Sequence, residues 1–269
     1  FAGQDATLGY VTGGKLTLGA TLLGHAGHDG GKIHIQAPQI QIGGTAQHAN
    51  TLLLDPEFFT KGGFSDHHLT GLGIAPGTAG QFLAGVIVAP GTKIEPVADN
   101  YTVVINPSTG AVSTKIVRNP VGLRSLTHLT LETSGVKGIE GLEIRGDIVL
   151  SLGSEIRTDP RGIVEIHGNT VTALGSIIAS GGYIDISGAD DSFPLLFGDQ
   201  TQALTTVYLG SQSRLSTAGT RVLIPDPIHL NRRLGEVLAG GDIHVSGNIA
   251  AATGAVLDVS GTSGILDLQ

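Results

Sequence analysis

Short stretches of alternating hydrophobic and polar residues, separated by glycines, recur along most of the chain. In GGDIHVSGNIAAATGAVLDVSG, residues 240–261, Ile243 and Val245 flank His244, and further short apolar stretches follow between glycines. Alternation with a period of two predicts strands, and glycines at close intervals predict turns. The pattern therefore predicts very short β-strands joined by tight corners, with almost no helix.

These strands and corners also repeat. The segment GDIVLSLGSEIRTDPRG, which begins at Gly146, aligns with GNTVTALGSIIASGG, which begins at Gly168, and each follows a short strand ending at Ile144 or Ile166. A repeat of about 20 residues that holds two or three strands is typical of one coil of a β-solenoid, in which each strand pairs with its equivalent in the next coil. The sequence therefore predicts an all-β parallel β-helix.

The alignment predicts a register for the stacked coils. Ile144 is expected to lie over Ile166, with Gly146 over Gly168. Gly168 is further expected to adopt a positive φ at its corner, so that replacement by Val would cost stability. One buried stripe is expected to contain Ile144, Ile166, Ile186 and Val245.

Four stretches interrupt the repeat, near residues 45–82, 89–125, 190–203 and 221–240. The first contains DPEFFTKGG, in which Asp55 and Pro56 predict the start of a single helical turn that ends before Gly62. The second contains a strand candidate over residues 101–105. We interpret all four as excursions from a single β-helical rod segment spanning residues 1–269, because long loops on a rigid scaffold often carry binding surfaces.

Composition narrows the function classes. The 269 residues include 42 Gly and no Cys, Met or Trp, which excludes disulfides, thiolate metal sites and a Cys nucleophile. The net charge of −8, with Arg232 and Arg233 as the largest basic cluster, predicts no nucleic-acid partner. The longest apolar runs, such as residues 84–90, are too short to span a bilayer, so no membrane insertion is expected.

Ten histidines raise the question of a metal site, and GHAGHDGG brings His25, His28 and Asp29 close together in sequence. A glycine-rich loop does not hold two imidazoles on one face as a helix does, so we predict no zinc or nickel site. The tandem G-G-x-G-x-D-x-U-x pattern of calcium-binding coils is also missing. We expect no metal and no cofactor. Solvated outward positions on strands are the favoured interpretation for most of His34, His67, His68, His128, His167 and His244.

Glycan-cleaving enzymes on solenoid folds need carboxylates on either side of the scissile bond. The candidates are Asp190 and Asp191 in GADDSF, with His167 or Arg161 one coil away. Adjacent aspartates in a strand point to opposite faces, and these two begin a proline-containing excursion, so a solvated turn is the favoured interpretation. We therefore predict no catalytic residues.

The repeats resemble those of filamentous haemagglutinin-like exoproteins of Gram-negative two-partner secretion. GGDIHVSGNIAAATGAVLDVSGTSGILDL, residues 240–268, is similar to the family's coil pattern, and DPEFFTKGGFSDHHLTGLG, residues 55–73, looks like a segment that recurs in its long rods; LGSIIASGGYIDISG is a further match. The resemblance implies a right-handed parallel β-helix and export through an outer-membrane β-barrel partner. The family's amino-terminal secretion domain is missing, so an internal stretch of a longer rod is expected.

The expected function is structural: a segment of a secreted or cell-surface adhesin fibre of a Gram-negative bacterium, which gives length, stiffness and contact loops. The expected partners are flanking coils of the same long chain or end-to-end stacked copies, with a host or neighbouring-cell surface or a glycan as a further possible contact. The alternative is a β-helical polysaccharide lyase or glycoside hydrolase, which would need clustered carboxylates in a groove.

The ends of a solenoid expose unpaired strand edges, which proteins normally cover with caps, charges or proline. The carboxyl-terminal GTSGILDLQ offers only Asp267 as a charge beside several apolar residues. We therefore expect the terminal coils to be paired in the native assembly, and Leu266 and Leu268 are expected to lie at the exposed edge.

Overall fold

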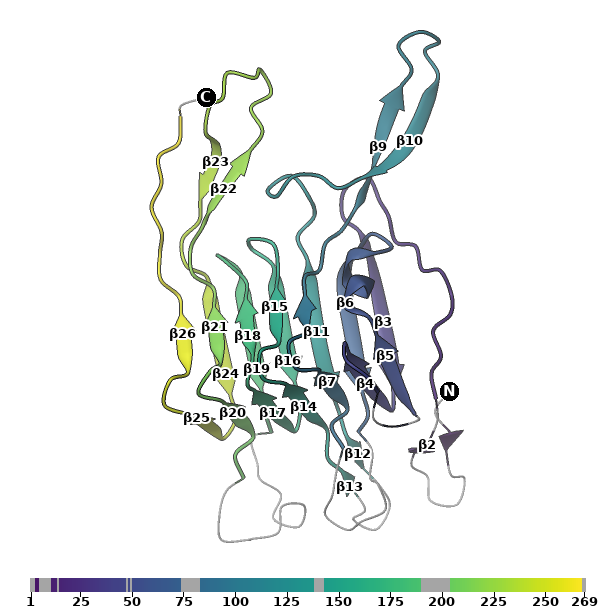
Figure 1. Ribbon diagram of the computed structural model, residues 1–269, viewed down its shortest axis with the longest axis vertical. Helices are drawn as coiled ribbons and strands as arrows, with labels where there is room; N and C mark the ends of the chain where they lie inside the picture. The colour runs from purple at the N-terminus through teal and green to yellow at the C-terminus, as the bar shows by residue number, and fades with distance from the viewer. Residues whose placement is uncertain are drawn as a thin grey trace.

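Three parallel sheets make up most of the molecule, and the chain passes from one to the next in order (Figure 1). The computed structural model describes residues 3–4, 11–13, 15–46, 48, 50–73, 83–137, 143–189 and 204–267. The fold is an all-β parallel β-helix, so the predicted fold class is confirmed.

The three sheets differ in strand number. The six-stranded sheet contains, in spatial order, β3 (Gly31–Ala37), β6 (Phe64–Gly71), β11 (His128–Thr133), β16 (Ile163–His167), β19 (Tyr183–Ser187) and β24 (Asp242–Ser246). The seven-stranded sheet contains β5 (Thr51–Leu54), β4 (Gln39–Ile42), β7 (Val86–Val88), β14 (Asp147–Leu150), β17 (Thr170–Ala173), β20 (Val207–Leu209) and β25 (Ile249–Ala251). The five-stranded sheet contains β8 (Lys93–Ile94), β15 (Glu155–Arg157), β18 (Ser176–Ile178), β21 (Arg214–Ser216) and β26 (Val256–Asp258).

The first coil departs from the rule of one strand for each sheet. After β4 the chain adds β5 on the outer side of β4 and then forms the 3₁₀ helix η1 (Pro56–Thr60) before it enters β6. The Asp55 carboxylate accepts a hydrogen bond from the Glu57 amide, and Pro56 opens the helix. The helical turn predicted at Asp55 and Pro56 is thus confirmed, because both residues satisfy the needs of a helix start.

Inward-facing side chains of successive coils stack on one another to form the core. In the six-stranded sheet one such stripe is Ile35, Leu69, Leu131, Ile166, Ile186 and Val245. The prediction for Ile166, Ile186 and Val245 is confirmed, whereas that for Ile144 is wrong. Leu131 takes its place, because Ile144 belongs to β13 (Glu143–Ile144), which pairs antiparallel with β12 (Val136–Lys137) outside the coil.

The predicted register between the two aligned coils is also wrong by one residue. Asp147 pairs with Thr170 rather than with the preceding residue, and Glu155 pairs with Ser176 rather than with the following one. The two errors have opposite signs because the corner at residues 151–154 is longer than its equivalent at residues 174–175. A slip of one residue exchanges the two faces of a strand, so corner length controls which side chains enter the core.

Glycines fill these corners for two different reasons. Gly153 has a φ of +72°, which favours glycine strongly. Gly168 is not among the positive-φ residues, so the predicted reason for its presence is wrong. A Cβ atom at Gly168 would instead lie 2.8 Å from Thr133 Oγ1, so the stacking of adjacent coils leaves no room for a side chain.

The excursions have different structures. The hairpin of β9 (Asn100–Ile105) and β10 (Val112–Val117) projects from the coils, as does that of β22 (Arg221–Ile224) and β23 (Leu234–Val237) (Figure 1). The predicted strand at 101–105 is β9 and is confirmed. By contrast, β6 and β8, which lie within the ranges 45–82 and 89–125, are strands of the coil. Residues 190–203 lie outside the described residues, and β1 (Gly3–Gln4) pairs with β2 (Val11–Gly13) near the amino terminus.

Ile166 and Ile163 in β16 provide a matched test of this packing. Ile166 faces inward with no exposed surface, whereas Ile163 faces outward and is partly exposed. Ile166→Ala is expected to lower the free energy of unfolding by about 2–5 kcal/mol, because it leaves a cavity between stacked coils. Ile163→Ala is expected to cost about 1 kcal/mol or less. Urea denaturation of both variants would measure this difference, and equal losses would contradict the assigned inward and outward faces.

Candidate functional site

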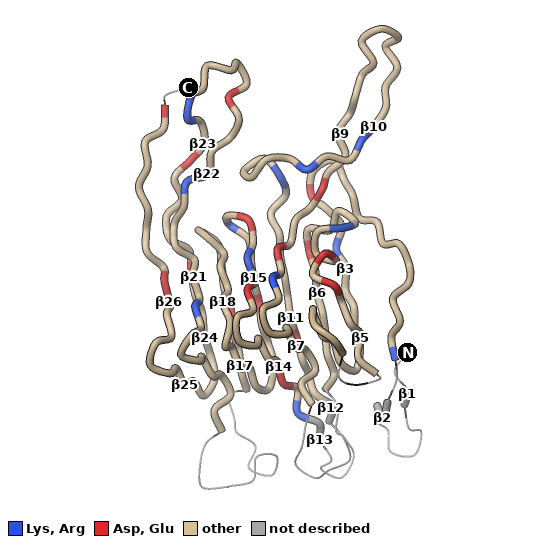
Figure 2. The backbone as a smooth tube through the Cα atoms, in the orientation of Figure 1, with Lys and Arg blue, Asp and Glu red and all other residues tan. Residues whose placement is uncertain are grey.

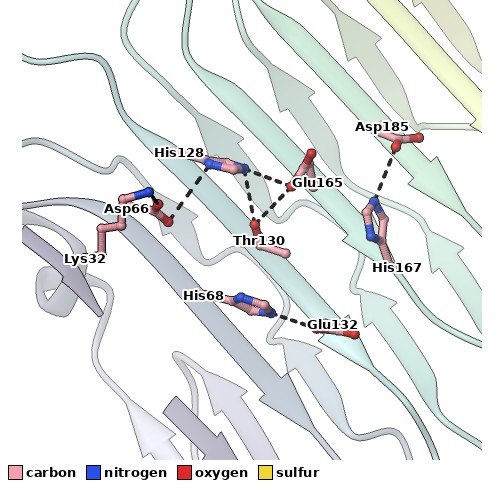
Figure 3. A network of polar contacts seen from close by, with 9 residues as sticks. All are labelled: Lys32, Asp66, His68, His128, Thr130, Glu132, Glu165, His167 and Asp185. Carbon is pink, nitrogen blue, oxygen red and sulfur yellow. Dashed lines mark hydrogen bonds and ion pairs between the residues drawn. The ribbon is translucent and has the colours of Figure 1, made fainter. Parts of the chain in front are cut away.

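The outer face of the six-stranded sheet carries a concentration of ionisable side chains. Strands β3 to β24 alternate apolar residues facing the core with polar residues facing outward, so their outward residues form rows across the coils. We call the paired members of these rows the histidine–carboxylate ladder. It consists of His244 together with seven residues that Figure 3 shows: Asp66, His68, His128, Glu132, Glu165, His167 and Asp185.

The first links of the ladder connect β6, β11 and β16. His68 Nε2 lies 2.7 Å from Glu132 Oε2, and His128 Nε2 lies 2.9 Å from Glu165 Oε2. The Thr130 hydroxyl donates to Glu165 Oε2 at 3.2 Å and also lies 3.2 Å from His128 Nε2. In-register pairing places these groups together although they come from different coils.

The ladder continues through Asp185 on β19. One carboxylate oxygen of Asp185 lies 3.3 Å from His167 Nε2 on β16, and the other lies 2.9 Å from His244 Nδ1 on β24. Every link therefore joins neighbouring strands, and the ladder extends from β6 to the last strand of the sheet.

At the amino-terminal edge of the same face, different contacts join β3 to β6. Lys32 Nζ lies 3.0 Å from Asp66 Oδ2, and Asp66 Oδ1 lies 4.0 Å from His128 Nδ1. The His34 and His68 rings stack with centroids 4.2 Å apart, and His34 Nε2 lies 2.9 Å from the Thr70 hydroxyl. Polar contacts thus connect all six strands of this sheet.

The ladder brings together two carboxylates that the sequence did not identify as neighbours. Glu165 and Asp185 occupy paired positions on adjacent strands, with Tyr183 beside them on β19. Partial burial raises the pKa of Tyr183, and the negative charges of Asp185 and Glu165 raise it further. Each carboxylate is already bonded to histidine, so the face serves foremost as a set of cross-strand ties between coils.

His67 is the exception among the histidines assigned to outward positions. The sequence favours a solvated position for it, but the structure buries its side chain completely on the inner face of β6. Burial lowers the pKa of His67 to about 4, a shift that the nearby Asp66 opposes only weakly. Two consecutive histidines on a strand must point to opposite faces, which was the signal available in the sequence.

The other candidate residues do not converge. His28 forms an exposed contact with its neighbour Asp29 at 3.0 Å, whereas the His25 ring packs against Tyr101 with centroids 5.5 Å apart. Arg161 forms an ion pair with Glu236 of β23. Asp190 and Asp191 lie outside the described residues.

Across the part of the chain that the structure describes, no three His, Cys, Asp or Glu side chains are arranged to hold a metal ion. Within that same part, the helix η1 has five residues, and no helix is long and apolar enough to cross a membrane. Lysine and arginine residues are scattered along the coils and hairpins rather than gathered in one stripe (Figure 2).

Comparison with protein-family models, curated proteins and solved structures finds no match to this chain. The resemblance to filamentous haemagglutinin-like rods therefore depends on the sequence motifs alone.

The ladder predicts a modest, pairwise contribution to stability. In a double-mutant cycle, His128→Ala and Glu165→Ala are expected to show a coupling of about 1 kcal/mol or less, because both side chains are about one-third exposed and partly screened by water. Arg214→Ala combined with Glu165→Ala serves as the control, since Arg214 lies in the five-stranded sheet and pairs with Asp258, so these two changes should be additive within about 0.5 kcal/mol. Coupling in the control pair equal to that of the contacting pair would argue against direct ties.

Proposed function

We propose that this chain is a stiff segment of a secreted or cell-surface adhesin fibre of a Gram-negative bacterium, of the filamentous haemagglutinin-like kind. In this proposal the β-helix supplies length and rigidity, and its excursions supply contact surfaces. The observation that carries the proposal is the open carboxyl-terminal end of the coil.

The last coil exposes side chains that every preceding coil buries. Leu257 on β26 is 51% exposed, whereas Leu215, its partner on the preceding strand β21, is 1% exposed. Ile249 on β25 is 49% exposed, whereas its partner Val207 is fully buried. Leu257 and Ile249 are exposed because no further coil is stacked on the last one.

A further coil is the occupant that matches this surface. Among the described strands, β24, β25 and β26 each pair on one side only, so their outer backbone groups are available for another parallel strand. A coil with the same three-sided cross-section would satisfy those groups and cover Leu257 and Ile249 together. Such a coil would come from the same long chain or from a copy stacked end to end.

The hairpins supply the proposed contact surfaces. β9–β10 and β22–β23 project on the same side of the coils (Figure 1). On β9–β10, the apolar side chains of Val103, Ile105 and Val112 lie on one face of the hairpin and are 63–69% exposed. Exposed apolar side chains grouped in this way are typical of protein interaction sites. The proposed partners are a host or neighbouring-cell surface and an outer-membrane secretion barrel during export.

A polysaccharide lyase or glycoside hydrolase on the same fold is the second candidate, favoured only by the neighbouring carboxylates Glu165 and Asp185. We expect no cleavage of acidic polysaccharides, because these groups are bonded to the histidines of the ladder. Assays for unsaturated and reducing ends would test this expectation. Cleavage by the wild-type chain that disappears in Glu165→Gln would make the enzyme the preferred function.

The open end predicts that chains associate end to end. A charged side chain at an inward position of the last coil should abolish this association. The wild-type chain is expected to form end-to-end assemblies, visible by electron microscopy and sedimentation velocity, and Leu257→Lys is expected to remain monomeric. The matched control is Val256→Lys, since Val256 is 45% exposed on the same strand but faces outward. A wild-type chain that stays monomeric at high concentration, or equal effects of both substitutions, would contradict the proposal.

The sequence predicts Leu266 and Leu268 at the exposed edge, whereas the structure shows Leu257 as an exposed inward residue of the last coil. Leu266 follows β26, where the chain runs beside β23: the Asp267 amide donates to the Arg233 carbonyl at 3.1 Å, and their side chains form an ion pair. Leu266 therefore does not lie at the edge of the last coil, and Leu268 lies outside the described residues.

A further inference from the structure

We propose that acid opens the amino-terminal end of the rod, and that protonation of the buried His67 is the trigger. The part that opens is η1 together with residues 15–24, which we call the amino-terminal cover, while the later coils remain folded. This inference is independent of the proposed adhesin function.

His67 lies in a cluster of aromatic rings that the cover helps to build. Its ring centroid is 5.3 Å from that of Phe59 and 5.8 Å from that of Phe58, both on η1. Phe64, at the start of β6, is 6.2 Å away. Closing η1 against β6 is therefore what removes the imidazole from water.

Neither ring nitrogen of His67 has a hydrogen-bond partner among the described residues. A neutral imidazole tolerates this environment at some cost, but a charged imidazole without a partner is far more costly to bury. The lowered pKa of about 4 has the same physical origin. Protonation thus favours any state in which the ring reaches water.

The charged groups near His67 do not lie inside the core, where they could pair with a protonated imidazole. Its paired neighbours, Ile33 on β3 and Leu129 on β11, are apolar. Asp66 lies on the outer face of the sheet, where it contacts Lys32 and His128. On η1, Glu57 forms an ion pair with Lys61.

Another imidazole at this end belongs to His25, which packs against Tyr101 and the backbone of Gly63. The aromatic cluster of His67 does not include it. His25 Nδ1 is also buried without a hydrogen-bond partner among the described residues, so His25→Gln serves as a control for a second histidine in the same region.

The amino-terminal cover also borders a groove. This groove of about 450 Å³ separates residues 18–23 from η1, with Leu18, Leu22, Phe58 and Phe64 among its lining residues. Phe58 and Phe64 form both the wall of this groove and the cluster around His67. A groove next to a buried ionisable group makes local opening less costly than opening of the stacked coils.

The sign of the pH dependence follows from the two protonation states. An exposed histidine binds its proton near pH 6.5, whereas His67 in the closed state does so only near pH 4. The closed state is therefore fully favoured above pH 6.5 and loses stability as the pH falls toward 4. The opening equilibrium is expected to increase by roughly two orders of magnitude between pH 7.5 and pH 4.5.

Hydrogen exchange followed by mass spectrometry tests the proposal on the full chain. After correction for the intrinsic exchange rate, the amides of η1, and those of Gly24 and Val97, which donate to the carbonyls of Gly62 and Phe59, should exchange roughly 100-fold faster at pH 4.5 than at pH 7.5. The amides of β6, β16 and β19 should stay protected. In His67→Leu the acceleration should fall to about threefold or less. His25→Gln and His68→Gln, which change neighbouring histidines outside the cluster, should behave like the wild type.

Three outcomes would overturn the proposal: full protection of η1 in the wild type at pH 4.5, simultaneous opening of all coils, or equal acid sensitivity in His67→Leu. If His67→Leu disturbs the cover at pH 7.5, the wild-type ring can be followed directly by nuclear magnetic resonance. A His67 imidazole that titrates near pH 6.5 while the cover stays closed would then contradict the proposal.

Discussion

Pairing between short parallel strands of successive coils is the constraint on which the rest of this structure depends. Most strands have between two and six residues, so no single coil could fold alone; each is held by backbone hydrogen bonds to its neighbours and by the stacking of inward side chains. Residues such as Ile166 and Ile186 pack because equivalent positions above and below hold similar side chains. The same rule explains why the last coil, with nothing stacked on it, exposes residues that are buried elsewhere.

The strand register that stacks the core side chains also sets which outward-facing side chains are neighbours. Because paired positions lie about 4.8 Å apart, an imidazole on one strand meets a carboxylate on the next without any special loop. The histidine–carboxylate ladder is thus a by-product of regular pairing that also reinforces it. His67 shows the opposite case, in which the inward side of the same strand holds an imidazole without any polar partner.

Much of the architecture could be predicted from local patterns, since alternation, glycine spacing and the Asp55–Pro56 pair act over only a few residues. The register could not, because it depends on corner length: residues 151–154 and 174–175 shift the pairing on either side by one residue. The sequence prediction for Ile144 is wrong because an antiparallel hairpin removes this residue from the coil. The ladder was missed for a related reason, as each link joins residues that are distant in sequence and become neighbours only when the coils are correctly aligned.

The distribution of corner lengths gives the rod distinct sides. Connections from the seven-stranded to the five-stranded sheet are always short, at residues 89–92, 151–154, 174–175, 210–213 and 252–255. The projecting hairpins β9–β10 and β22–β23 instead leave between the five-stranded and six-stranded sheets. One edge of the rod is therefore smooth and another is decorated, so segments inserted at the decorated edge can change in length and sequence during evolution while the stacked coils beneath them keep the same geometry.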